Sequence, residues 1–314
     1  MEILRIIISI ALVFLPIVFW GYLFSYAQNS KLSATRFFIG IFAGSLSVLP
    51  IVHSKEIFEF FSAQSIFSYL SAPSISLSFI ESLLVSYGLP IILFLGVLCA
   101  VFYKQIVGRF GLMMRSVGVI GLFVLAFLGM SFLLGGKSAV GDTQIELLGA
   151  TLASLGSITL AYLFIGALEE ATKHFALYPS LETAEITPKY IALTAVFTAL
   201  GFAFLENVYY LIHLALENGM FSSSFLGTLI SRSIVSLLLH IFAALVFALG
   251  FGRYIAAQNR SMYGKFILAF FLAIGVHALF DISLTYGKTG IIAIYAIVGY
   301  FFFTKVFFDE RAQS

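Results

Sequence analysis

Long apolar stretches, separated by short polar segments, recur along the whole of this 314-residue chain. A helix of about 18 or more apolar residues can cross the roughly 30 Å hydrocarbon core of a bilayer with every backbone hydrogen bond made internally. The pattern therefore predicts an all-α, polytopic helical membrane protein with about nine transmembrane helices. The predicted spans are 3–27, 37–53, 83–103, 116–135, 145–168, 189–215, 226–251, 263–285 and 289–308.

Two segments need a separate interpretation. Residues 54–82 are rich in serine with scattered phenylalanines, and we expect a short amphipathic helix at the membrane interface. Ser25-Tyr26-Ala27 has the small-x-small form of a signal-peptidase site, so residues 1–27 are also a candidate signal peptide. The apolar run is too long for one, and entry with the N-terminus inside would reverse the charge bias of every later loop. We therefore interpret it as a transmembrane helix.

Composition agrees with the membrane class and excludes others. Hydrophobic residues make up 61% of the chain and charged residues only 10%, far outside the range of soluble domains. The one cysteine, Cys99, excludes an intramolecular disulfide and any cysteine-based metal cage. No basic stretch with interleaved aromatic residues is present, so we expect no nucleic-acid partner.

Basic residues predict the orientation, because loops rich in Lys and Arg stay on the cytoplasmic side. Twelve follow the first, third, fifth and seventh spans or lie in the C-terminal tail: Lys31, Arg36, Lys104, Arg109, Arg115, Lys173, Lys189, Arg253, Arg260, Lys265, Lys305 and Arg311. Four lie at the N-terminus or in the alternate loops: Arg5, Lys55, Lys137 and Lys288. The split predicts an N-terminus outside and a C-terminus in the cytoplasm.

Ionisable side chains interrupt the apolar pattern in the second half of the chain. Such a group costs about a few kcal/mol at bilayer depth, so it usually faces a polar cavity or a partner. Four successive spans carry them: Glu169, Glu170 and Lys173; Glu206 with Asn207; Arg232 and His240; His277 and Asp281. The first 140 residues hold nothing comparable. We therefore predict a four-helix extension of unknown role over 1–140 and a domain with one assembled polar site over 141–314.

The first group, Glu169-Glu170-x-x-Lys173-His174, lies at the predicted cytoplasmic end of the fifth span. Spacing of i,i+4 places Glu169 beside Lys173 and Glu170 beside His174. A cap of charges in the headgroup region is one interpretation, because long charged side chains reach water cheaply from a helix end. The other is functional, since two repelling carboxylates in a poorly solvated place include a candidate general base.

Glu206 lies deeper. It is about seventeen residues from the cytoplasmic start of the sixth span, or roughly 25 Å along the helix, too far to reach the interface easily. Glu169, by the same count, lies near the cytoplasmic face. If the fifth helix continues to Tyr178, before Pro179, Glu169 and Glu170 lie roughly 12–15 Å from the end of that helix. Helix tilt or a broken helix could close the rest of the gap.

The last two groups add histidines. His240 and Arg232 are eight residues apart and can line one broad helix face, with Arg232 a counter-charge for a carboxylate or a residue that reaches the outer interface. His277 and Asp281 are at i,i+4, so the carboxylate can fix the tautomer of the imidazole. Each group could also be a satisfied polar contact between helices. Together they can activate a water molecule and stabilise an oxyanion, or hold a metal ion.

These motifs resemble, in order, those of the PrsW family of intramembrane proteases, itself similar in pattern to the CAAX-prenyl and bacteriocin-processing membrane proteases. The resemblance covers roughly 145–290. The Phe-centred motif ends here in Glu206 where the CAAX group has a histidine, which favours PrsW. The resemblance implies catalytic or metal-binding roles for Glu169, Glu170, Glu206, His240 and His277. It implies a supporting role for Asp281, and the other candidate supporting residues are Lys173, Asn207 and Arg232.

The predicted activity is therefore hydrolysis of a peptide bond in a membrane-anchored protein, with an anti-sigma factor as the candidate substrate if the resemblance extends that far. One model places a divalent metal, most simply Zn²⁺, on Glu170, Glu206, His240 and His277. The other is metal-free, with a glutamate as general base and the histidines as oxyanion donors. A proton- or ion-coupled transporter with the same groups as a relay is the alternative function, and a non-catalytic scaffold is a third. We expect a multi-pass protein of a bacterial or archaeal plasma membrane.

Overall fold

The structure is a computed structural model. It describes residues 2–27, 34–52, 94–100, 103, 107, 110–120, 145–147, 150–152, 155–181, 187–220, 222–257 and 263–308. The predicted interfacial segment 54–82 lies outside these residues, as do parts of the third and fourth predicted spans. Of those two spans, residues 94–100 and 110–120 are helical, so the fourth helix includes residues before the predicted start at 116.

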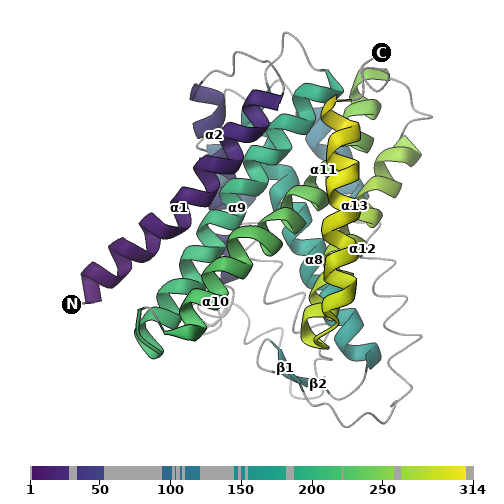
Figure 1. The fold of residues 1–314 in the computed structure, drawn as a ribbon. Helices are drawn as coiled ribbons and strands as arrows, with labels where there is room; N and C mark the ends of the chain where they lie inside the picture. The colour runs from purple at the N-terminus through teal and green to yellow at the C-terminus, as the bar shows by residue number, and fades with distance from the viewer. Residues whose placement is uncertain are drawn as a thin grey trace, which may run out of the picture.

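The protein is a bundle of long apolar helices (Figure 1). The main helices are α1 (Glu2–Ala27), α2 (Ala34–Leu46), α8 (Leu155–Leu177), α9 (Pro188–Glu217), α11 (Leu237–Ala257), α12 (Tyr263–Thr285) and α13 (Thr289–Phe308). Shorter elements are α3 (Leu49–Val52), the 3-10 turn η1 (Tyr178–Ser180), α10 (Ser223–Ser231) and the π-helix η2 (Arg232–Ser236). Helices α10, η2 and α11 follow one another without a break.

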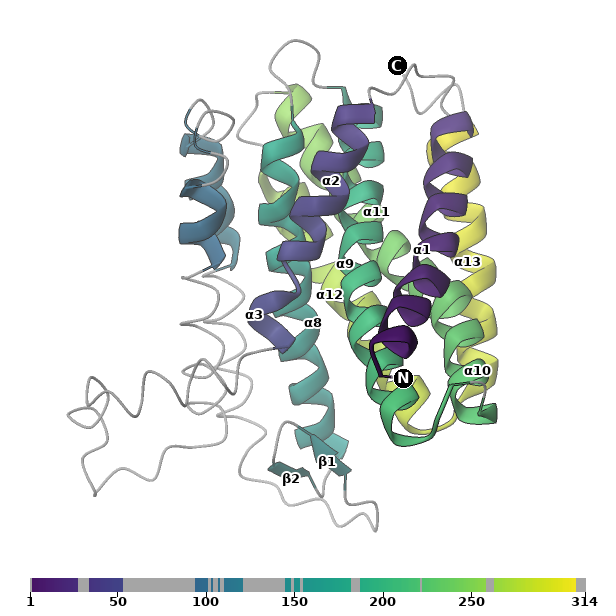
Figure 2. The same cartoon turned by 90° about the vertical axis from the view of Figure 1, so that its left-hand side faces the viewer.

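Helix α9 is the centre of the bundle. Helices α1, α2 and α11 pack along it, α12 packs on α11 and α8, and α13 lies against α11 and α12 (Figures 1 and 2). The start of α9 is fixed locally, because the Thr187 side chain accepts a hydrogen bond from the Tyr190 backbone N–H and Pro188 occupies the first turn. Gly219, with φ +82°, follows its end.

Helices α2 and α9 approach so closely that only glycine fits at two contacts. A Cβ at Gly44 would lie 2.0 Å from the carbonyl oxygen of Thr198, and one at Gly201 would lie 2.0 Å from that of Ile41. The Ser45 hydroxyl also donates to the Gly201 carbonyl oxygen at 3.0 Å. Small residues allow this kind of backbone contact between membrane helices. The N-terminal helix α2 is thereby joined to the helix that carries Glu206.

The fifth predicted span is wrong at both ends. Residues Ile145–Leu147 and Ala150–Leu152 form a two-stranded antiparallel hairpin, β1 and β2, where a helix was expected. The helix starts instead at Leu155 and runs to Leu177, where η1 with Pro179 ends it. The spans predicted over 263–285 and 289–308 agree with α12 and α13.

The expected helical membrane class is confirmed. Four described helices are long and apolar enough to cross a bilayer: Ile3–Phe24, Pro188–Glu217, Ser223–Ala256 and Tyr263–Thr285. The start of α1 and the end of α13 lie at opposite ends of the bundle (Figure 1). The total of nine spans, the absolute orientation and the division at residue 140 stay predictions.

Candidate active site

The predicted polar residues of four helices meet inside the bundle. Glu169, Glu170 and Lys173 come from α8, Glu206 and Asn207 from α9, Arg232 and His240 from η2 and α11, and His277 and Asp281 from α12. Glu169, Glu170, Lys173, His240 and His277 are buried. Since ionisable groups without partners are costly in such a place, their contacts decide what the site can do.

Lys173 lies at the centre of one half of the site. Its Nζ donates to Glu170 Oε1 at 2.7 Å and to His240 Nδ1 at 3.0 Å, and lies 4.1 Å from the centre of the Phe202 ring. Glu169 Oε2 is farther from this ammonium, at 3.6 Å. Lys173 therefore compensates Glu170 most directly. It was counted above among cytoplasmic loop residues, which is wrong, so the split of basic residues becomes eleven to four.

Glu206 has two partners on the continuous helix formed by η2 and α11. Its Oε2 lies 2.8 Å from Arg232 Nη2 and 3.0 Å from His240 Nε2. Arg232 also donates through Nε to Asn207 Oδ1 at 2.7 Å, and its guanidinium lies 3.9 Å above the Tyr210 ring. Of the two roles expected for Arg232, these contacts match the counter-charge.

The π-helix η2 explains how one helix supplies both Arg232 and His240. A π-turn inserts an extra residue into the helical register, and such bulges are frequent at functional sites. Here η2 covers Arg232–Ser236, and both of these residues line the same cavity as His240. The sequence gives no signal for this bulge.

His277 contacts both glutamates of α8. Its Nδ1 lies 2.9 Å from Glu170 Oε1, and its Nε2 lies 3.3 Å from Glu169 Oε2. Asp281 Oδ2 is 3.5 Å from the same Nε2, so the expected i,i+4 contact is present but is the longest of the three. Gly166 makes room for this approach, because a Cβ there would lie 3.3 Å from the Cβ of His277.

Three donor atoms are close enough to hold a metal ion. One ligand atom from each of Glu169, His240 and His277 lies within 4.8 Å of the others, and all three residues are buried. Tetrahedral zinc with bonds of about 2.0 Å places its ligand atoms roughly 3.3 Å apart, which is the separation of Glu169 Oε2 and His277 Nε2. The residues present therefore fit a metal. The carboxylate in this group is Glu169, whereas Glu170 bonds to Lys173 and to the second nitrogen of His277.

A cavity of about 760 Å³ gives access to these groups. Glu169, Glu206, His240, His277 and Asp281 line it. Its lining continues to residues near the ends of α9, α10 and α12, among them His213, Thr228 and Thr285. His213 and Thr285 are exposed, so this end of the cavity lies at the surface of the bundle.

The depth difference expected between Glu169 and Glu206 is resolved. Because α8 continues for two turns beyond the glutamates, Glu169 lies about 12 Å from the end of its helix. The ring centres of His240 and His277 are 5.3 Å apart, and His240 contacts Glu206 while His277 contacts Glu169. The helix continues as proposed, and the carboxylates share one site.

His174 and His213 have partners that the sequence did not indicate. His174 Nε2 lies 2.8 Å from Ser116 Oγ, among aromatic rings that include Phe247 and Phe251. His213 lines the open end of the cavity and pairs with Glu217, the last residue of α9.

Other cavity residues were missed. Tyr210, Ser236, Tyr162 and Thr285 all line it, and the Tyr162 and Thr285 hydroxyls are 2.5 Å apart across α8 and α12. The only signal was position: Tyr210 lies one turn after Glu206, and Ser236 one turn before His240.

Carboxylates and imidazoles that share a cavity within a bundle of apolar helices mark a functional site, and the same residue types act as general acids and bases in hydrolysis. A family model described as PrsW family intramembrane metalloprotease matches residues 117–307. The match covers more than half of the chain, and the chain belongs to the PrsW family. No curated protein and no solved structure matches it.

The membership establishes the broad activity. The chain is an intramembrane protease and therefore a hydrolase, and it acts in a bilayer on a protein substrate. It also implies a metal, for which the buried Glu169, His240 and His277 are a possible site. The family assignment favours the predicted protease over the transporter and the scaffold.

Proposed function

We propose that the assembled residues are the hydrolytic site, with Glu206 as the general base and Glu169, His240 and His277 as metal ligands. The observation that carries the proposal is the convergence of Glu169, Glu206, His240 and His277 on one cavity wall. Substrate enters this cavity from the end that holds His213 and Thr285. Hydrolysis needs a water molecule beside the base and a peptide carbonyl beside a group that stabilises negative charge.

In this proposal the residues around Glu206 prepare it to accept a proton. The carboxylate takes a proton from water as the oxygen bonds to the peptide carbonyl carbon. When the C–N bond breaks, the proton passes to the leaving amine. The Arg232 guanidinium, 2.8 Å away, is the counter-charge for a Glu206 carboxylate. Lys173 neutralises Glu170, which holds His277 through Nδ1 and fixes the ring orientation.

The metal would be Zn²⁺, since imidazole nitrogens and a carboxylate oxygen are its usual ligands in catalytic sites. When bound, it supplies Lewis acidity toward the water and the carbonyl oxygen. Asp281 lies 3.5 Å from His277 Nε2 and adds negative charge on the same side. In the metal-free alternative, Lys173 and Arg232 would supply the positive charge that compensates the carboxylates.

The substrate would be a single-pass membrane protein, with an anti-sigma factor as the candidate, in a bacterial or archaeal plasma membrane. The apolar helices around the cavity support a substrate that is itself held in the bilayer. The test is cleavage of a panel of single-pass proteins by the purified enzyme in liposomes. Cleavage of at least one member by the wild type is expected, and cleavage of none under any metal condition would contradict the proposal.

Metal content separates the two mechanisms. The metal model predicts about one Zn²⁺ per chain by elemental analysis, loss of cleavage after chelation, and recovery on adding zinc back. Glu169→Gln should lower the bound metal, whereas Glu217→Gln, an exposed acid, should not. Full activity in a sample with far less than one metal per chain would exclude the metal model.

A further inference from the structure

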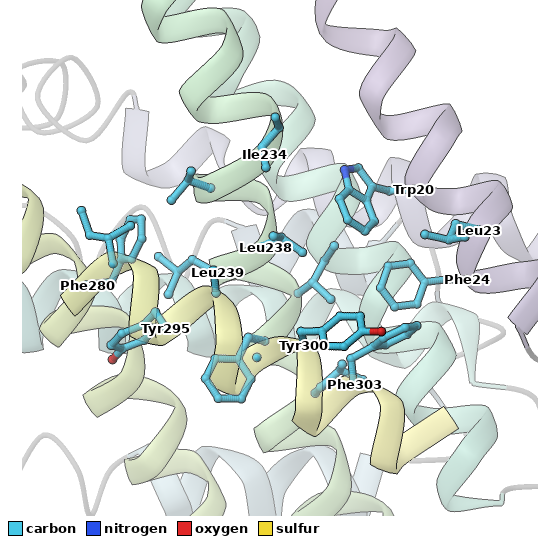
Figure 3. A pocket seen from close by; sticks show the side chains of 17 residues that line it. Trp20, Leu23, Phe24, Ile234, Leu238, Leu239, Phe280, Tyr295, Tyr300 and Phe303 are labelled. Atoms are coloured by element: carbon cyan, nitrogen blue, oxygen red, sulfur yellow. The ribbon is translucent and has the colours of Figure 1, made fainter. Parts of the chain in front are cut away.

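An apolar crevice lies on the lipid-facing side of the bundle, behind the polar cavity. It has a volume of about 250 Å³ and is formed by α1, α11, α12 and α13. Figure 3 shows Trp20 and Phe24 of α1 at one end, Phe280 and Tyr295 at the other, and Leu238 and Leu239 of α11 between them. The lining is almost entirely apolar, so it is unsuited to a polar or charged ligand.

The crevice and the polar cavity share a wall. Leu239 and Phe280 line both, and they immediately precede His240 and Asp281 in the sequence. Residues of the π-helix η2 also line both the crevice and the cavity, from opposite sides of the helix. Ile234 and Val235 line the crevice, whereas Arg232 and Ser236 line the cavity. A segment bound in the crevice therefore lies one side chain away from the catalytic groups.

Helix α13, which forms one side of the crevice, lies at the surface of the bundle. Among the α13 residues whose side chains the structure describes, only Val306 is buried. Its crevice side includes the small residues Ala296 and Gly299, and its outer face carries exposed Ile294 and Ile297. Small side chains let another helix approach closely within a bilayer.

We propose that this crevice binds the transmembrane anchor of the protein substrate. The inference rests on the proposed function, which requires a membrane-anchored substrate. The lining positions on α13 run from Ile292 to Phe303, twelve residues with a rise of about 17 Å from first to last, or about three helical turns. Apolar side chains from three turns of an anchor fill the crevice, and the peptide bond next to the anchor passes over Leu239 and Phe280 to the carboxylates.

Continuity with the cavity favours the anchor over a lipid acyl chain as the occupant. An acyl chain could fill the crevice, but binding of a lipid would not depend on the wall that the crevice shares with the polar cavity. An anchor in this position shortens the path from the bilayer to Glu206. It also holds the cleaved segment in place, which lowers the entropy cost of reaction.

The test fills the crevice and compares two substrates. Ala296→Phe places a large ring in it, and Ile297→Phe places the same ring on the exposed face of α13 as the control. The substrates are the cleaved member of the single-pass panel and a soluble peptide with the same cleavage sequence but no anchor. We expect Ala296→Phe to lower the ratio of kcat/KM for the anchored protein to that for the peptide by about tenfold, the effect of a small misfit in an apolar pocket. Ile297→Phe should keep the wild-type ratio.

An unchanged ratio in Ala296→Phe would overturn the inference and leave the crevice to lipid. An equal loss on both substrates would also overturn it, because the substitution would then act on the catalytic residues. A cross-link gives an independent readout, since Cys99 is the one native cysteine. In a Cys99→Ser, Glu206→Gln background, Leu238→Cys should form a disulfide with a cysteine in the anchor, and Ile297→Cys should not.

Failure of the proposed function looks different. If the wild type cleaves neither the anchored protein nor the peptide, the proposed function fails and this inference fails with it. If the wild type cleaves both and Glu206→Gln cleaves neither, the site stands, and the Ala296→Phe ratio alone decides the role of the crevice.

Discussion

Both imidazoles of the site have charged groups at both ring nitrogens. His240 contacts Lys173 through Nδ1 and Glu206 through Nε2, and His277 contacts Glu170 through Nδ1 and Glu169 through Nε2. Such contacts fix the tautomer and orientation of a histidine. Each histidine must exchange one of these contacts before that nitrogen can bind a metal or a developing oxyanion, so small changes in its partners should have large effects.

Arg232 offers a residue-scale prediction. Its planar guanidinium contacts Glu206, Asn207 and the Tyr210 ring at once. Lysine keeps the charge but cannot reproduce this geometry. Arg232→Lys should therefore lower kcat/KM by roughly tenfold or more, since a hydrogen bond to a charged group contributes about 1.5–3 kcal/mol.

The measurement is cleavage of the panel substrate at matched protein levels. Arg253→Lys is the matched control, because Arg253 is exposed on α11 and lies outside the cavity lining. Wild-type kinetics for Arg232→Lys would reduce Arg232 to a simple counter-charge.

The sequence predicted which residues meet but not how they pair. Hydropathy and the cost of buried charge marked Glu206, His240 and His277, and the structure brings them together. The i,i+4 spacing from Glu170 did not predict the partner of His174, which is Ser116 on another helix. Contacts between distant helices, such as that of Glu170 with His277, have no local signal in the sequence.

At the scale of helices, the boundaries of the last two spans were predicted well, and both boundaries of the fifth span were not. Long apolar runs define α12 and α13, and their ends agree with the structure. The apolar run before Leu155 gave no sign of a hairpin, because short strands and short helices cannot be distinguished by apolar content alone. Glu169 and Glu170 suggested a helix end, yet tertiary burial carries α8 on to Leu177.

The α2–α9 contact leads to a prediction about stability. A Cβ at Gly44 would collide with the backbone at Thr198, so Gly44→Ala must push the two helices apart. Overpacking of this kind costs about 1–3 kcal/mol. We expect a lower thermal unfolding midpoint in detergent, together with weaker cleavage, because α9 also carries Glu206.

Gly275→Ala is the control for this change. Nothing lies within 4 Å of a Cβ at Gly275, and alanine favours a helix over glycine by about 1 kcal/mol. It should leave the midpoint equal or slightly raised. If Gly44→Ala were as stable as Gly275→Ala, the close contact of α2 with α9 would be in doubt.

At the scale of the whole molecule, the orientation predicts which face the substrate approaches. With Lys173 removed from the count, eleven basic residues against four still predict a cytoplasmic C-terminus. The open end of the cavity lies near the ends of α9 and α12, on the side where α1 begins (Figure 1). We therefore expect the substrate to enter from the outer side.

Reporter fusions test this orientation. Fusions after Lys104 and Arg260 should both show a cytoplasmic signal, and a fusion at the N-terminus should show an outer one. A cytoplasmic N-terminus with outer signals at Lys104 and Arg260 would invert the protein and move the open end of the cavity to the cytoplasm.

The most direct test of the central claim is cleavage by Glu206→Gln. Glutamine is nearly isosteric with glutamate but cannot accept a proton from water, so we expect an inserted, folded protein without proteolysis. Glu217→Gln changes an exposed acid at the end of the same helix and should cleave at the wild-type rate. Wild-type turnover by a well-expressed Glu206→Gln would contradict the claim that this buried cluster is the hydrolytic site.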